Sequence, residues 1–292
     1  MFQRILVAID FSDPSVEALE WVTRRFPEAR ITLFHAIEIV RPGSYLREAL
    51  GEILDPVAEN ELDVRSNLEH LAREYGIEPR ISISSGWPPR EVHRAAADED
   101  ANLIVLGAHV RRMWPGDPPG TMANKIVEGA DRQVLVWRRV PKLADPGDRK
   151  VLAALDLREG SGPVAETAVH FARYFGANLL LLHVMTSALQ AYLRAVSTPT
   201  KTQETLRQLE GIARQELLEQ LPETCRDETD VRPIVLRGRP FTQIIAAAES
   251  ESANVIVLGR GHSPNLPERA LLGRVTEKVL RGANCSVLVV PL

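Results

Sequence analysis

Cysteine, aromatic residues and basic charge are all scarce in this chain of 292 residues, in which aromatic side chains make up 5%. The two cysteines, Cys225 and Cys285, lie far apart and without the spacing of metal ligands, so we expect no disulfide and no tight transition-metal site. The formal net charge of −4 offers no basic excess for a nucleic-acid partner. The scarcity of cysteine and the absence of a basic excess favour an ordinary globular protein of a reducing compartment.

Long apolar runs are missing as well. None approaches the roughly 18 residues of a membrane span, so we expect no membrane partner. The first apolar run, residues 5–9, meets Asp10 too early for a secretory signal peptide. We therefore expect a cytoplasmic location.

The chain repeats itself. Matched segments keep the same order, with offsets that drift from 146 residues near the start to 153 near the end, which predicts a duplicated domain rather than a solenoid. The charged, proline-containing segment 138–150 separates the copies, and we place the domains at residues 1–140 and 149–292. The clearest matches are "RILVAID" (4–10) with "KVLAALD" (150–156) and "ANLIVLG" (101–107) with "ANVIVLG" (253–259).

Within each half, short continuous apolar runs alternate with helical patterns. Runs such as "ILVAI" and "LIVLG" are typical of strands buried on both faces of a parallel sheet. Residues 57–75 predict a helix that places Leu62, Leu68, Leu71 and Tyr75 near one face. The order predicts an α/β fold of two tandem doubly wound domains.

Glycines bracket a loop in each half. Gly107 and Gly259 end apolar runs, and helical patterns begin near Gly120 and Gly273. Ligands of doubly wound sheets bind beyond the carboxyl ends of the strands, and a helix start offers free N–H groups to a phosphate. Glycine lets the backbone approach that phosphate closely. The alternative is that these glycines only permit tight turns between strand and helix.

The segments "ANLIVLG" (101–107), "ANVIVLG" (253–259) and "LLGRVTEKVLRGANCSVLVVP" (271–291) resemble the universal stress protein family, as a tandem of two such domains. The resemblance implies a mainly parallel five-stranded sheet flanked by helices in each half. It also implies a role in stress survival and signalling, and binding of ATP or AMP at the strand ends, with Mg²⁺ accompanying ATP.

The nucleotide-binding branch of the family resembles the pattern Gly-x-x-Gly, nine residues, then Gly-Ser or Gly-Thr. In the first half Gly107, Gly120 and Thr121 fit this pattern, and Val110 replaces the second glycine. The hydroxyl of Thr121 could donate a hydrogen bond to phosphate.

The second half departs further from the pattern. Gly259 fits, but His262 occupies the second glycine position and Gly261 comes one residue early. The spacing to Gly273 is one residue too long, and Arg274 replaces the Ser or Thr. The arginine could pair with phosphate or exclude it. We therefore expect the first half to be the better nucleotide site.

Four residues match the part of the family site that holds the nucleoside. Asp10 and Asp156, after the first strand of each half, could hydrogen-bond the ribose or base. Ala36 and Val184 fall where the backbone would meet adenine.

We identify no catalytic residues. No Gly-x-Ser-x-Gly motif and no specific Ser-His-Asp order is present, so we expect slow ATP hydrolysis at most. His35 and His183 occupy equivalent places at strand ends, where packing or hydrogen bonding is expected. A nucleotide-free interaction or scaffold protein of the same fold is the alternative function, and an enzyme that uses a nucleotide is a weaker third.

The final apolar runs of the two halves, 134–137 and 287–290, would each be an exposed sheet edge if left alone. In the family such strands pair across a dimer axis. The resemblance therefore implies an intramolecular pseudo-dimer, and it leaves open a homodimer of the whole chain.

Overall fold

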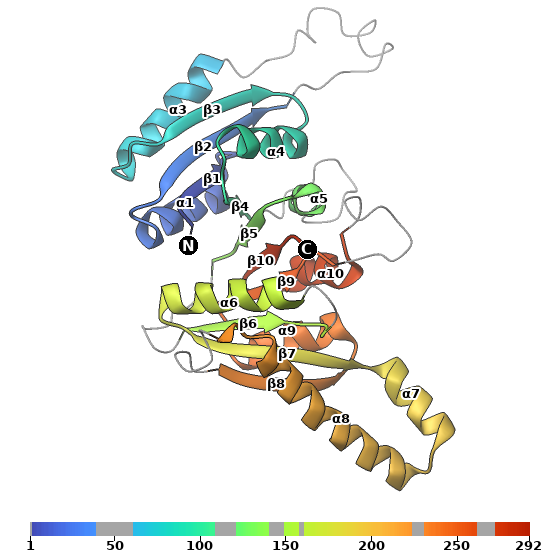
Figure 1. Cartoon of the computed structure of the whole chain (residues 1–292). Coiled ribbons are helices and arrows are strands. Elements are labelled where there is room, and N and C mark those ends of the chain that lie inside the picture. The colour runs from blue at the N-terminus through green and yellow to red at the C-terminus, as the bar shows by residue number, and fades with distance from the viewer. Residues whose placement is uncertain are drawn as a thin grey trace, which may run out of the picture. The chain divides into compact units, whose positions relative to one another are not determined.

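A computed structural model describes residues 2–38, 61–108, 121–139, 149–157, 161–223, 231–261 and 272–292. The chain divides into two compact units, Phe2–Trp137 and Arg138–Leu292. Each unit is an α/β structure in which helices flank a sheet (Figure 1).

The sheet of the first unit has the strand order β3-β2-β1-β4-β5, and all its neighbouring strands are parallel. The elements are β1 (Arg4–Ala8), α1 (Asp13–Arg25), β2 (Arg30–Ile37), α3 (Glu61–Glu74), β3 (Arg80–Ser85), α4 (Pro88–Asp98), β4 (Leu103–Gly107), α5 (Thr121–Gly129) and β5 (Gln133–Trp137).

The sheet of the second unit repeats this topology with the order β10-β9-β6-β7-β8, again parallel throughout. The doubly wound fold predicted for each half is thereby confirmed. The elements are β6 (Lys150–Ala154), α6 (Ser161–Phe175), β7 (Asn178–Thr186), α7 (Ser187–Val196), α8 (Pro199–Glu219), β8 (Val231–Gly238), α9 (Pro240–Ser250), β9 (Val255–Gly259), α10 (Arg274–Gly282) and β10 (Ser286–Val290).

The central strands form the core of each unit. In β1 and β4 the residues Leu6, Val7, Ile104 and Val105 are completely buried, as the continuous apolar runs predict for strands covered on both faces. Helix α3 covers part of β2 and β3, and it buries Val64, Leu68 and Ala72.

The prediction of the apolar face of α3 was wrong at one position, because the side chain of Leu62 is 72% exposed. The buried residues of α3 are four apart and form a narrower stripe that excludes position 62.

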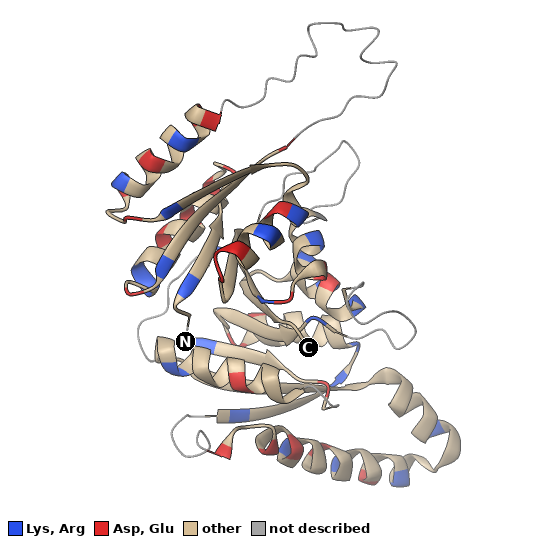
Figure 2. Cartoon of the chain, turned by 45° about the horizontal axis from the view of Figure 1, so that its top comes forward, with Lys and Arg blue, Asp and Glu red and all other residues tan. Residues whose placement is uncertain are grey.

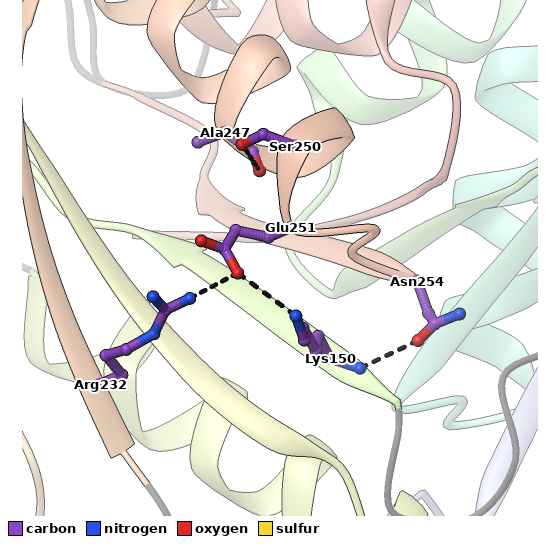
Figure 3. Close-up of polar contacts among 6 residues, drawn as sticks. All are labelled: Lys150, Arg232, Ala247, Ser250, Glu251 and Asn254. Carbon is purple, nitrogen blue, oxygen red and sulfur yellow. Dashed lines mark hydrogen bonds and ion pairs between the residues drawn. The ribbon is translucent and has the colours of Figure 1, made fainter.

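A polar cluster fixes the amino-terminal edge of the second sheet (Figure 3). The carboxylate of Glu251, just after α9, lies 2.5 Å from the guanidinium of Arg232 on β8 and 3.3 Å from the ammonium of Lys150 on β6. The backbone N–H of Lys150 donates to the side-chain oxygen of Asn254 at 2.9 Å. Arg232 and Lys150 hold the pKa of Glu251 below its usual value, with the hydrogen bond from Arg232 as the largest cause.

The first unit carries a corresponding cluster. Arg80 on β3 pairs with Glu99 at 2.8 Å, and the N–H of Arg4 donates to the side chain of Asn102 at 3.3 Å. The side chain of Arg4 pairs instead with Asp100, at 2.9 Å. The two copies thus preserve one ion pair at the edge opposite the carboxyl ends of the strands, between an arginine of β3 or β8 and the glutamate just after the following helix: Arg80–Glu99 and Arg232–Glu251.

Candidate functional site

Each sheet reverses its strand order next to its first strand. In the first unit β1 has β2 on one side and β4 on the other, with Ala8 opposite Leu106. The same arrangement places Ala154 of β6 opposite Leu258 of β9. Parallel sheets bind their ligands in the crevice beyond such a reversal.

In the first unit, Asp10 follows β1 at this point and its side chain is exposed. Phe11 has a positive φ of 58°, a conformation that is unusual for a bulky residue and that accumulates at functional sites. The carboxylate of Asp10 accepts hydrogen bonds from the N–H of Ser12, at 3.0 Å, and from the hydroxyl of the same residue. The Ser15 hydroxyl donates to the carbonyl oxygen of Ser12 at 2.9 Å and accepts from the N–H of Asp10 at 3.3 Å. These bonds fix the turn that presents the carboxylate.

The second unit repeats this turn. Asp156 is exposed after β6, and Leu157 also has a φ of 58°. The hydroxyl of Ser161, at the start of α6, donates to the Asp156 carboxylate at 3.0 Å. Both units therefore present an exposed carboxylate at the reversal of strand order, and in both a serine five residues further along the chain bonds to the aspartate, at its backbone N–H in the first unit and at its carboxylate in the second.

Two histidines support these turns from the neighbouring strand. His35 Nδ1 lies 2.7 Å from the carbonyl oxygen of Ile9, and His183 Nδ1 lies 2.9 Å from that of Leu155. A carbonyl oxygen only accepts, so each Nδ1 carries the proton. The ring of Phe11 packs against that of His35, with the ring centroids 5.0 Å apart and the planes tilted by 38°. No group of three His, Cys, Asp or Glu residues within the described ranges could hold a metal ion.

Gly107, at the end of β4, allows close packing. A methyl group at this position would lie 2.4 Å from the carbonyl carbon of Pro14 and 2.5 Å from the backbone nitrogen of Ser15. The start of α1 therefore rests directly on the end of β4, beside the turn that holds Asp10. Gly259 differs, because the nearest described atom to such a methyl is Cδ1 of the Leu292 side chain, at 2.8 Å.

In the second unit, the backbone directly after β9 contacts the start of α10. The N–H of Gly273 donates to the carbonyl oxygen of Arg260 at 3.0 Å, and Thr276 Oγ1 donates to that of Gly259 at 2.9 Å. Gly261 has a φ of 90°, and a methyl there would lie 2.9 Å from the Cα of Gly273. The backbone is thus packed tightly at both glycines, and the N–H of Gly273 already has an acceptor.

The other predicted site residues are placed as follows. Arg274 is exposed at the first position of α10. Ala36 is half-buried on β2 opposite Ser84, and Val184 is buried on β7 opposite Leu236. Val110 and Gly120 lie outside the described residues, as does the side chain of Thr121, whose backbone begins α5.

Sequence reasoning missed the serines that hold the two aspartate turns. Ser15 and Ser161 are 2% and 4% exposed. A signal for them was present, because both copies place a serine five residues after the matched aspartate. The amide of Asn124, on α5, was also missed. Both its polar atoms are buried and have no hydrogen-bond partner among the described residues, and no pattern in the sequence marks it.

No helix in the described part of the chain is long and apolar enough to cross a membrane.

A family model described as "Universal stress protein family" matches residues 1–138 and again residues 148–291. Among curated proteins, "Universal stress protein MJ0531" of Methanocaldococcus jannaschii is 30% identical over 143 residues, which is 49% of this chain and 81% of that protein. "Universal stress protein YxiE" of Bacillus subtilis is 27% identical over 148 residues, or 47% of this chain and all of that protein.

A solved structure resembles the chain over nearly its full length. The crystal structure of a universal stress protein from Archaeoglobus fulgidus has a TM-score of 0.67 and 18% identity, and the match covers 99% of this chain and 98% of that one. At this identity the likeness shows the fold.

Proposed function

Because the chain belongs to the universal stress protein family, we propose that it is a stress-response protein that binds an adenine nucleotide, ATP or AMP, at the carboxyl ends of its strands. The observation that carries the proposal is the pair of matched turns that hold Asp10 and Asp156 exposed at the reversal of strand order. We also propose that the two domains extend over residues 1–140 and 149–292.

In this proposal the aspartate carboxylate accepts hydrogen bonds from the ribose hydroxyls, because an ionised carboxylate has acceptors only. The backbone near Ala36 or Val184 meets the adenine. The phosphates lie at the start of α5 or α10, where the first N–H groups of the helix and its dipole favour an anion. Mg²⁺ would accompany ATP and offset the charge of its phosphates.

We expect the first half to hold the nucleotide. Three features of the second half support this asymmetry. The N–H of Gly273, which precedes α10, is already bonded to Arg260, and Arg274 stands where the pattern has a hydroxyl. Gly261 also comes one position early.

Isothermal titration calorimetry of the full chain with ATP and Mg²⁺ tests the proposal. Replacing a charge-assisted hydrogen bond with a neutral one costs about 1.5 kcal/mol, so we expect Asp10→Asn to weaken binding at least tenfold. The matched control, Asp156→Asn, should leave binding within about twofold of the wild type. The reverse result would move the nucleotide to the second half.

A nucleotide-free scaffold is the second candidate, and the close backbone approach of Gly261 to Gly273 favours it for the second half. Mass spectrometry of small molecules released from freshly purified, denatured protein distinguishes the two functions. Absence of nucleotide there, together with no heat on adding millimolar ATP, would establish the scaffold.

We further propose that the halves form an intramolecular pseudo-dimer through β5 and β10. Each of these apolar strands lies at the edge of its own sheet, and an unpaired edge promotes aggregation. Hydrogen exchange of the intact chain tests the idea. The outward amides of both strands should be protected together, whereas fast exchange on either edge would contradict the pairing.

A further inference from the structure

The second unit contains a cavity of about 780 Å³ that the proposed nucleotide site does not use. It lies among α7, α8 and β8, where α7 leads away from the carboxyl end of β7 and α8 returns toward β8 (Figure 1). β8 lies at the opposite edge of this sheet from β10. One strand, β7, separates it from β6, which precedes Asp156 of the proposed nucleotide site. The volume falls in the range of small-molecule sites, about 300–1,000 Å³.

Three arginines from three elements line this cavity: Arg194 from α7, Arg207 from α8 and Arg237 from β8. Figure 2 shows basic and acidic residues interspersed along α8. Glu204 is the acidic residue among the lining side chains. The lining therefore carries more positive than negative charge.

The three guanidinium groups are not equivalent. Arg237 Nε donates to Glu210 at 2.6 Å, and both side chains of this pair are mostly buried. Glu210 thus neutralises Arg237 at the wall of the cavity. Arg194 and Arg207 are exposed and form no ion pair with a described residue. Their donors are available to a ligand.

The junction of the two helices is fixed by hydrogen bonds. Ser197 Oγ donates to the carbonyl oxygen of Leu193 at 2.9 Å, and the Ser197 and Thr202 hydroxyls lie 2.7 Å apart. Thr198 caps α8 by accepting from the N–H of Lys201 at 3.4 Å. A wall held in this way loses little freedom when a ligand binds.

The remaining lining residues combine two kinds of surface. Thr200 and Gln203 lie seven and four positions before Arg207 on α8, on the same face, and offer uncharged polar groups. Pro199 supplies exposed apolar surface, and Leu206, which is 2% exposed, lies at the floor of the cavity. Guanidinium groups bind phosphate and carboxylate through paired hydrogen bonds.

We propose that this cavity binds a small organic anion, whose phosphate or carboxylate group contacts Arg194 and Arg207. The uncharged part of the ligand packs against Leu206 and Pro199. The site is independent of nucleotide binding in either half, because it shares none of the residues assigned to that function.

Calorimetry of the full chain with glucose 6-phosphate and, separately, citrate tests this proposal. We expect at least one of the two to bind, and the one that binds more tightly shows whether the site prefers a phosphate or a carboxylate. The double variant Arg194→Gln, Arg207→Gln should weaken that binding at least tenfold, because it removes two charge-assisted contacts. Both side chains are exposed, so we expect the variant to fold normally.

Arg214→Gln is the matched control, since Arg214 is an exposed arginine of α8 that does not line the cavity. It should leave the affinity within about twofold of the wild type. Three results would overturn the proposal: no heat from either probe at millimolar concentration, unchanged affinity in the double variant, or an equal loss in the control.

Discussion

Replacing Gly107 with alanine tests the packing of α1 on β4. The added methyl would lie 2.4 Å from a backbone carbon, about 1 Å inside ordinary van der Waals contact, so the start of α1 must move. Overpacking in a rigid site costs about 1–3 kcal/mol, and a clash with backbone lies near the top of that range. We expect the first unit to lose about 3 kcal/mol of unfolding free energy.

Tryptophan fluorescence reads this effect selectively, because all four tryptophans of the chain lie at or before Trp137. If the free energy of unfolding falls by about 2 kcal/mol per molar of urea, the urea midpoint of the fluorescence transition should fall by about 1.5 M. Far-UV circular dichroism reports on both units, and its first unfolding step should then occur at a lower urea concentration.

Gly259→Ala provides the matched control. The added methyl would meet the end of the flexible Leu292 side chain, which can rotate away. This variant should leave the fluorescence transition in place and cost the second unit less than about 1 kcal/mol. A fluorescence midpoint that moves by less than about 0.5 M in Gly107→Ala would refute the packing argument.

Two further predictions concern the second unit. The pKa of Glu251 is lowered in the folded chain, so its ion pairs stabilise the unit above the ordinary glutamate pKa, and this contribution is lost as the pH falls through the lowered value. Glu251→Gln should therefore destabilise the unit at pH 7 and have little effect near pH 3, as measured by urea unfolding with circular dichroism, and an equal loss at both pH values would contradict the role of charge. Burial raises the pKa of the Cys285 thiol to about 11, so in a Cys225→Ser variant iodoacetamide at pH 8 should react with the native chain roughly 100-fold more slowly than with the chain in urea. Equal rates in the two states would show that this thiol is accessible.

The strands could be predicted from the sequence because burial on both faces produces continuous apolar runs. The runs around Val7 and Val105 carry this signal without help from the rest of the chain. Amphipathic helices carry a weaker signal, and Leu62 shows why. Which leucines of α3 are buried depends on the angle at which the helix meets β2 and β3, and local spacing does not contain that angle.

The candidate site was predictable in part. Two copies of one pattern identified Asp10, Asp156 and the strand-end glycines. The role of Gly107 in holding the start of α1 was not accessible, because Pro14 and Gly107 are far apart in the sequence and meet only in the folded unit. The cavity beside α8 was missed for the same reason, since its arginines come from three separate elements.

The strand order has a consequence for synthesis on the ribosome. Ile5 of β1 pairs with Leu103 of β4, and Val151 of β6 pairs with Val255 of β9, so each first strand waits for a partner about 100 residues downstream. At about 5–20 residues per second, that interval lasts roughly 5–20 s. β2 and β7 follow their first strands much sooner and pair with the opposite edge. The β4-facing edge of β1 and the β9-facing edge of β6 are therefore the surfaces of the nascent chain that most need the protection of a chaperone.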